Sequence, residues 1–402
     1  MFRHLLQLTW KRKSRNVMLS LEILLAFCIV FGVAAFGVRY TQLYDMPLGF
    51  DAADVWSVTI QAGDNGTTRL DETVYETFRR GLAELPEVRE VGFASFEPYA
   101  MSTFASDMRR SSGNGSGKKV YTELLEADDR LDRALGLKLV EGRWFSNLDN
   151  GSALRPAVIN RRMADAMFPG EHALGQQFRD GEGAKPSAGY RVVGVVDNYR
   201  SKGELSAPVN FAFLRFEAGK NNHDIHTILL KVKPGTERSF ETRLNRRLKL
   251  VRNDWSYQIT PLSSARASML RTLTTPLIVV AVIAAFMLLM VAFGLFGALW
   301  QNTTQRIPEL GLRRALGASA GQIYRQIIAE QFLLSSGAIL LGLVLLVQLP
   351  LTGALGESLN WTVFGGAALL ATGVIYLISC VRALYPGWRA SRLSPTEALH
   401  YE

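Results

Sequence analysis

The chain has 402 residues, a mean hydropathy of +0.09 and a formal net charge of +9. This length exceeds one ordinary domain and a positive mean hydropathy is unusual for a soluble protein, so a single soluble domain is excluded. The segment 39–275, called the outer segment below, is nearly balanced in charge. Most of the positive excess therefore lies beside apolar stretches, which argues against a nucleic-acid-binding surface.

Four stretches are long and apolar enough to cross a bilayer, which requires about 18 or more nearly uncharged residues. They are residues 18–38, 276–300, 332–350 and 361–381. The first stretch starts too late and runs too long for a cleaved signal peptide, so we expect it to be retained as a span. The only cysteines, Cys28 and Cys380, both lie in spans, so the outer segment has no disulfide.

The positions of Lys and Arg predict how the spans are oriented, because cytoplasmic flanks are enriched in positive charge. Residues 1–17, 301–331 and 382–402 are basic, whereas the short loop 351–360 has no Lys or Arg. Both termini and segment 301–331 are therefore expected in the cytoplasm, with the outer segment and loop 351–360 on the other side. Residues 1–17 are predicted as an amphipathic helix on the inner leaflet, with a disordered basic tail as the alternative.

The outer segment alternates β-patterned runs with amphipathic helical runs, which predicts an α+β domain large enough for two subdomains. The predicted strands are 55–60, 88–96, 120–125, 192–196, 210–216, 225–232 and 257–260. The predicted helices are 71–85, 128–135 and 240–251. A helix capped by Ser263 should then run to Trp300, about 57 Å at ~1.5 Å per residue if Pro276 does not kink it.

The spans carry few polar groups where a solute path would need them. Between Pro276 and Leu299 there is no polar side chain, and the one ionisable residue inside any span, Glu22, is close enough to the cytoplasmic edge to snorkel. This pattern argues against a substrate path through the membrane. Small residues favour close helix packing instead, namely Ala338, Gly342, Ala367 and Ala371.

We find no motif for catalysis, cofactor binding or metal binding. Residues 113–119 come nearest to an ATP-binding loop, but the first glycine and the final hydroxyl residue of that motif are replaced, so the energy should come from another polypeptide. His223 and His226 form a His-x-x-His pair without further ligands nearby, which favours solvated histidines over zinc. The acidic pair Asp128 and Asp129 is interpreted as a helix cap rather than an acid–base pair.

Residues 305–331 form a charged, helix-forming segment between two apolar spans. Pro308 suits the first turn of a helix, Glu309 suits its positive N-terminal end and Gly317 suits its end, which predicts a short surface helix. A second helix is predicted from Gly321 into the next span. On the residues alone, this is a basic connecting loop, which Arg313 and Arg314 could hold on lipid phosphates.

The sequence of this segment resembles that of the cytoplasmic coupling loop of FtsX/MacB-type ABC transporter permeases. The matching residues are Arg306, Glu309, Leu310, Gly311, Leu312, Arg313, Arg314, Ala315, Leu316, Gly317 and Ala318. In that family the helix docks in a groove of the partner ATPase. The resemblance therefore implies that these residues couple the chain to an ATPase.

Other segments extend the resemblance to nearly the whole chain. The runs that resemble the periplasmic domain of MacB-type permeases are 141–145, 157–160, 167–170 and 192–196. Ala173 replaces a proline that is usual there, and physically Gly142 and Gly170 serve turns. Residues 385–390 and 394–399 resemble the family's closing pattern, with His400 where arginine is usual. The tail is either a membrane-surface anchor or a contact with the ATPase.

The resemblance implies a membrane α-helical fold with four transmembrane helices and a large extracytoplasmic α+β domain between the first and the second. The predicted organisation is an N-terminal helix 1–17, spans 18–38, 276–300, 332–350 and 361–381, outer domain 39–275, coupling loop 301–331, periplasmic loop 351–360 and tail 382–402. The expected location is the bacterial inner membrane, with both termini cytoplasmic and the large domain in the periplasm.

The function that the resemblance implies is that of a non-catalytic permease subunit of an ABC-type exporter. ATP and Mg²⁺ would be bound by a separate ATPase subunit, whose motion the chain transmits to its periplasmic domain for efflux of an antibiotic, peptide or lipoprotein. The expected partners are this ATPase, a second permease, identical or paralogous, and membrane lipids, with a periplasmic adaptor and an outer-membrane channel in some systems. The alternative is an FtsX-like signalling platform that controls cell-wall hydrolases or senses antibiotics without transport. The residues select no cargo.

Overall fold

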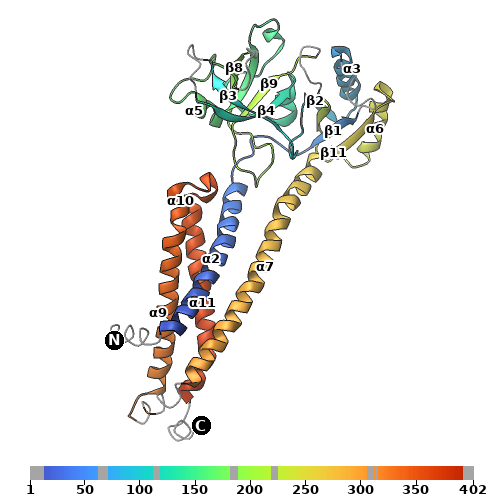
Figure 1. Ribbon diagram of the computed structural model, residues 1–402. Helices are drawn as coiled ribbons and strands as arrows, with labels where there is room; N and C mark the ends of the chain where they lie inside the picture. The colour runs from blue at the N-terminus through green and yellow to red at the C-terminus, as the bar shows by residue number, and fades with distance from the viewer. Residues whose placement is uncertain are drawn as a thin grey trace. The chain divides into compact units, whose positions relative to one another are not determined.

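The computed structural model describes residues 13–61, 71–111, 118–181, 189–218, 225–305, 312 and 316–392. The chain divides into two compact units (Figure 1). The helical unit comprises Met1–Gln42 and Thr274–Glu402, and the inserted domain comprises Leu43–Leu273. The predicted N-terminal helix falls mostly on residues 1–12, which lie outside the described residues.

Four helices among the described residues are long and apolar enough to cross a membrane. They are α2 (Lys13–Tyr44), α7 (Leu262–Thr304), α9 (Ala320–Leu346) and α11 (Trp361–Arg392). The four predicted spans are thus confirmed as apolar helices, although the third continues through a turn at Val347 into α10 (Gln348–Thr352). A short 3₁₀ helix, η2 (Gly356–Leu359), precedes α11.

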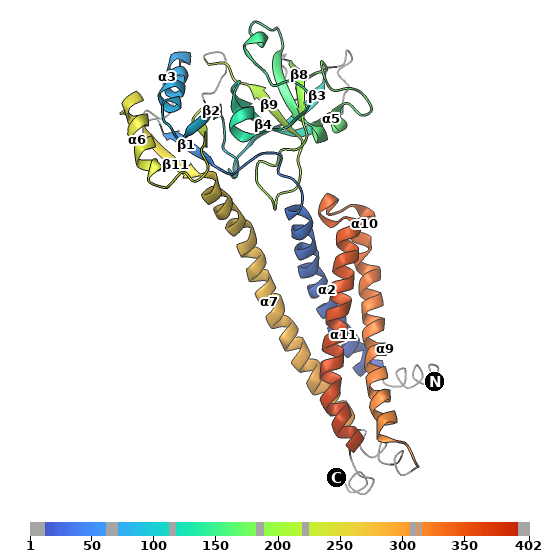
Figure 2. The ribbon, with the colours of Figure 1, turned by 180° about the vertical axis from the view of Figure 1, so that it is seen from behind.

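The core of the helical unit forms where α2, α9 and α11 meet. α9 and α11 run side by side in both views (Figures 1 and 2). Ser335 and Ser379 share a buried hydroxyl hydrogen bond of 2.8 Å between these two helices. Ala367 and Ala371 are fully buried, and a side chain at Gly342 would meet the ring of Phe27. The small residues therefore permit close packing, as the sequence predicts.

The strands of the inserted domain form one 11-stranded sheet. The strands are β1 (Val55–Gln61), β2 (Val88–Ala94), β3 (Phe104–Arg110), β4 (Val120–Ala127), β5 (Leu139–Gly142), β6 (Arg155–Asn160), β7 (Gln177–Asp180), β8 (Tyr190–Val196), β9 (Phe211–Arg215), β10 (Thr227–Val232) and β11 (Ser256–Pro261). Its helices are α3 (Glu72–Ala83), α4 (Leu131–Leu135), η1 (Asn147–Asp149), α5 (Arg161–Met167) and α6 (Phe240–Val251).

The sheet has two parts. The order β4-β3-β7-β8-β6-β9 closes on itself because β9 also pairs with β4 in parallel, and we call this the barrel lobe. The order β11-β1-β10-β2 is an open sheet that packs against α3 and α6, and we call it the open-sheet lobe. The predicted mixture of strands and helices is present, but part of the sheet closes into a barrel, which the sequence pattern did not indicate. The pattern missed it because β3, β5 and β7 were not recognised as strands.

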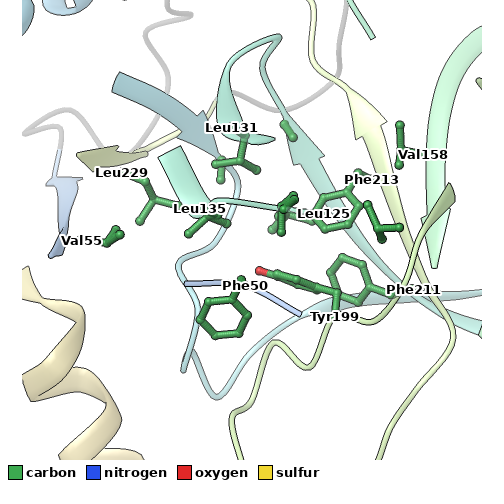
Figure 3. Close-up of a cluster of buried hydrophobic side chains, with 14 of the residues drawn as sticks. Phe50, Val55, Leu125, Leu131, Leu135, Val158, Tyr199, Phe211, Phe213 and Leu229 are labelled. Atoms are coloured by element: carbon green, nitrogen blue, oxygen red, sulfur yellow. The ribbon is translucent and has the colours of Figure 1, made fainter. Parts of the chain in front are cut away.

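A cluster of buried side chains joins the two lobes (Figure 3). Tyr199 lies between the rings of Phe50 and Phe211, at centroid distances of 5.4 and 4.5 Å. Val55 and Leu229 come from the open-sheet lobe, and Leu262 and Met269 from the start of α7 complete the cluster. The first turns of α7 therefore belong to the core of the inserted domain.

Three local predictions need correction. α4 starts at Leu131 rather than at Asp128, and no side chain caps it. The carboxylates of Asp128 and Asp129 form ion pairs with Arg79 and Arg215, and Asp128 Oδ1 accepts from the Arg130 backbone amide at 3.3 Å, one residue before the helix. Ser263 does not cap α7, because the helix already begins at Leu262, directly after β11.

Gly142 and Gly170 both have positive φ angles, +72° and +75°, which confirms the predicted turns. Their surroundings differ, because a Cβ at Gly142 would lie 2.3 Å from the Val193 carbonyl oxygen whereas nothing lies within 4 Å at Gly170. We expect Gly170→Ala to cost about 1–2 kcal/mol of unfolding free energy through backbone strain alone. Gly142→Ala should cost at least about 2 kcal/mol more, because Val193 belongs to a buried strand that must shift. Chemical unfolding followed by tryptophan fluorescence measures both, and equal costs would contradict the close approach at Gly142.

Candidate functional site

The structure describes only part of the predicted coupling loop. Leu312, Leu316, Gly317 and Ala318 are among the described residues. The other predicted coupling residues, Arg306, Glu309, Leu310, Gly311, Arg313, Arg314 and Ala315, lie outside the described residues. Their role stays a prediction.

The described part of the loop presents two exposed leucines, Leu312 and Leu316. Leu312 is 56% exposed and Leu316 is 80% exposed, and the amide of Leu316 donates to the carbonyl of Leu312 over 3.0 Å. Residues four positions apart in a helical turn lie on one face, so the two side chains form a small apolar surface. Gly317 ends the turn with a φ of +96°, as its sequence position predicts.

α9 begins with a capping box that sequence reasoning overlooked. The Ser319 hydroxyl accepts from the Gln322 amide at 3.3 Å, and the Gln322 side chain accepts from the Ser319 amide at 3.0 Å. The Ser-x-x-Gln spacing is a known helix-start signature and could have predicted this boundary. The capping box therefore fixes the residue at which the loop containing Leu316 ends and α9 begins.

A second candidate site lies in the inserted domain, where the loop 199–206 meets the end of α2. The Arg200 side chain is 2% exposed. Its guanidinium donates to the carbonyls of Leu43 and Met46, both at 2.9 Å. It also donates to the carbonyl of Ser206 at 2.7 Å and to that of Glu204. A cation thus satisfies carbonyls at and just beyond the C-terminal end of α2, where a helix leaves acceptors without partners and carries partial negative charge.

The same loop also contacts the start of α7. Glu204 is 5% exposed, and its Oε1 lies 2.5 Å from Nε of Arg266. This hydrogen bond raises the pKa of Arg266. We call Arg200, Glu204 and Arg266, with the carbonyls of Leu43 and Met46, the base knot. It connects the end of α2 with the first turns of α7.

Tyr99 packs against the base knot in a strained conformation. Its φ is +69°, and its amide donates to the Ser201 carbonyl at 2.6 Å. A Cβ at Gly203 would lie 2.7 Å from the Tyr99 ring, so only glycine permits this approach. Burial, together with the charge of Glu204, raises the pKa of Tyr99. The Tyr99 hydroxyl and Glu204 Oε2 are both buried and have no hydrogen-bond partner within the described part of the chain.

The loop 199–206 is also held by the barrel lobe. Glu123 of β4 accepts from the Ser201 hydroxyl at 3.2 Å and from the Lys202 ammonium at 2.7 Å. One loop therefore fixes a barrel strand, the end of α2 and the start of α7. Sequence reasoning missed these residues because the contacts join positions near 43, 200 and 266, and no spacing in the chain indicates them.

The predicted pair of histidines, His223 and His226, is only partly described. His223 lies outside the described residues, and the buried Nδ1 of His226 has no hydrogen-bond partner among the residues that the structure describes. Within the described ranges, no group of three or more His, Cys, Asp or Glu residues is placed to hold a metal ion.

Replacing Arg200 tests the base knot. Arg200→Met leaves the buried carbonyls of Leu43, Met46, Glu204 and Ser206 without their charged donor, so we expect unfolding to become easier by about 3–5 kcal/mol. Arg110→Met is the matched control, because Arg110 forms an exposed bidentate pair with Glu171 and its loss should change stability little. Denaturant unfolding of both purified variants measures this difference. Similar unfolding curves for Arg200→Met and Arg110→Met would contradict the assigned role of Arg200.

Comparison with known proteins agrees with this architecture. The family model of the MacB-like periplasmic core domain matches residues 18–246, and that of the FtsX-like permease C-terminal region matches residues 281–395. The chain is 25% identical to the macrolide export ATP-binding/permease protein MacB of Bdellovibrio bacteriovorus, over 97% of this chain and 60% of that protein. It is 22% identical to the uncharacterized ABC transporter permease YknZ of Bacillus subtilis, over 97% of this chain and 96% of that protein.

Among solved structures, the periplasmic region of MacB from Actinobacillus actinomycetemcomitans matches 57% of this chain and 97% of that chain, with 15% identity and a TM-score of 0.39. The chain spans about 60% of the length of the Bdellovibrio MacB. The two family models together match residues 18–246 and 281–395, which is most of the inserted domain and of the apolar helices. The chain belongs to the MacB-like periplasmic core domain family and is an FtsX/MacB-type ABC transporter permease of the inner membrane.

Proposed function

We propose that this chain is the permease subunit of an ABC-type exporter that works by mechanotransmission. A separate ATPase subunit, which binds ATP and Mg²⁺, drives movement at the coupling loop 301–331. α7 carries this movement to the inserted domain, which lies in the periplasm and expels a substrate that is already there. The expected substrates are antibiotics, peptides or lipoproteins.

The observation that carries the proposal is the continuity of α7. It is one helix from Leu262 to Thr304, and Pro276 does not interrupt it. Its 43 residues correspond to about 64 Å at ~1.5 Å per residue. It begins within the base knot through Arg266 and ends just before the predicted coupling residues. A helix of this kind can transmit a tilt or a shift from one end to the other.

The faces of α7 fit this role. Val282, Phe286 and Phe293 are 63–66% exposed, and such apolar side chains suit lipid or the second permease of a dimer. The exposed Leu312 and Leu316 suit an apolar groove on the ATPase. The positive flanks of the spans support cytoplasmic termini and a periplasmic inserted domain.

The proposal of a separate ATPase is supported by the match over 96% of YknZ, which is named as an ABC transporter permease. The Bdellovibrio MacB is named as an ATP-binding/permease protein, and the chain covers 60% of it. A second permease, and in some systems a periplasmic adaptor and an outer-membrane channel, would complete the assembly.

The second candidate is an FtsX-like signalling platform, and the match of residues 281–395 to the FtsX-like permease model favours it. It would use the same coupling loop and the same α7, but the inserted domain would regulate a partner such as a cell-wall hydrolase. Transport measured in reconstituted vesicles distinguishes the two, because only the exporter moves a solute.

Alanine substitutions at the coupling loop test the proposal. Leu312→Ala, Leu316→Ala, Glu309→Ala and Arg313→Ala should each weaken binding of the co-expressed ATPase by about tenfold or more, which corresponds to ~1.4 kcal/mol. Stimulation of ATP hydrolysis by the permease should fall accordingly.

Leu355→Ala is the control for the leucines, because Leu355 is 52% exposed in the loop expected on the other side of the membrane. It should leave ATPase binding unchanged. If the coupling-loop variants bind and stimulate the ATPase as well as the Leu355 control does, the role assigned to residues 306–318 is wrong.

A further inference from the structure

A cleft of about 630 Å³ lies in the inserted domain, between the two lobes. One side is formed by α3 and Phe93 of the open-sheet lobe. The other side is formed by residues 128–133, by the start of η1 and by residues 215–218, which end β9 and follow it. This volume lies within the range of roughly 300–1,000 Å³ that is usual for small-molecule sites.

The floor of the cleft consists of charged groups that are already paired. Nη2 of Arg79 lies 3.0 Å from Asp128, which is 6% exposed, and the Arg79 guanidinium lies over the Phe93 ring at 5.2 Å. Arg215, 5% exposed, donates to both carboxylate oxygens of Asp129 at 2.7 and 2.9 Å. Burial raises the pKa of Asp128 to about 6, although Arg79 acts in the opposite direction. Charged groups kept in such a place are typical of binding clefts.

The two walls above this floor carry opposite charges. Glu72 and Glu76 are exposed on α3 and are four residues apart, so they share one face of the helix. Glu76 approaches Arg79 at 3.3 Å but its side chain remains 47% exposed. Across the cleft, Arg130 and Arg133 are exposed and have no ion-pair partner within the residues that the structure describes. Asp129 and Glu217 also line this side, but both are paired with Arg215, so the exposed charge is acidic on α3 and basic at Arg130 and Arg133.

Apolar surface lies between the charged walls. Phe216 and Ala218 are partly exposed and line the cleft. The Phe216 ring meets the buried Tyr75 ring edge-on at 5.3 Å, and the Tyr75 hydroxyl is held by the backbone of Ile225. These contacts fix Phe216 in place, so the apolar strip is preorganised.

We propose that this cleft binds a zwitterionic, peptide-like ligand, with its ammonium group at Glu72 and Glu76 and its carboxylate at Arg130 and Arg133. A purely anionic ligand would meet the acidic wall and a purely cationic one the basic wall, whereas a short peptide matches both and lays its side chains on Phe216. The inference rests on the proposed function and deepens it, because it names the chemical class of the exported substrate.

The probe is a series of alanine peptides of three, four and five residues, each compared with its N-acetylated and its C-amidated form. Binding is measured by isothermal titration calorimetry on the full-length permease in nanodiscs, without ATPase. At least one free peptide should bind about tenfold or more tightly than either of its blocked forms. Equal affinities of the free and blocked forms, or no saturable binding of any free peptide, would overturn the proposal.

Two double variants test which wall binds which end of the peptide. Arg130→Gln with Arg133→Gln should make the amidated peptide bind as well as the free one, because the carboxylate has lost its partners. Glu72→Gln with Glu76→Gln should do the same for the acetylated peptide. All four side chains are exposed, so the fold should survive, and Arg80→Gln on the outer face of α3 is the control. If both double variants keep the full discrimination, the walls are not the site.

This experiment is independent of the coupling loop. Peptide binding does not require the ATPase, and ATPase stimulation by the coupling variants does not require peptide. Loss of either result therefore leaves the other interpretable.

Discussion

The interaction on which the rest depends is the burial of one guanidinium, that of Arg200, among backbone carbonyls. It binds the carbonyls of Leu43 and Met46 and those of Glu204 and Ser206. Each hydrogen bond to a charged group contributes about 1.5–3 kcal/mol, and a buried carbonyl that loses its donor is costly. The end of α2 therefore cannot move relative to the loop 199–206 without breaking several bonds at once.

The attachment of α7 to the same loop is weaker. Besides the buried Leu262 and Met269, its polar contact is the pair of Glu204 and Arg266, and the Arg266 side chain is 42% exposed, so solvent screens the pair. Tyr99 and Glu204 each retain a buried oxygen without a hydrogen-bond partner, which leaves local bonding capacity unused. This asymmetry gives the loop a firm contact with α2 and a more easily rearranged contact with α7. A helix that relays motion into the inserted domain needs such a difference.

Much of the architecture could be predicted because long apolar runs and alternating patterns leave a clear signal. The spans, β1, β10, α3 and α6 follow directly from such runs. The barrel could not be predicted, because β3, with the sequence FASDMRR, is largely polar and the parallel pairing of β4 with β9 joins distant residues. The coupling residues came from resemblance to a family. No pattern in the sequence indicated the base knot or the charged walls of the cleft, since packing alone brings Arg200, Arg266, Arg130 and Arg133 into place.

The most direct test of the central claim, that ATP-driven movement reaches the inserted domain through α7, is hydrogen exchange in the reconstituted permease–ATPase complex. Amide exchange over residues 199–206 and 262–273 is compared with and without ATP, in the unmodified chain and in Arg266→Gln. The account predicts an ATP-dependent change in both segments of the unmodified chain, and loss of the change over residues 199–206 in the variant while ATPase binding persists. Unchanged exchange in both segments on addition of ATP, in a complex that hydrolyses ATP, would contradict it.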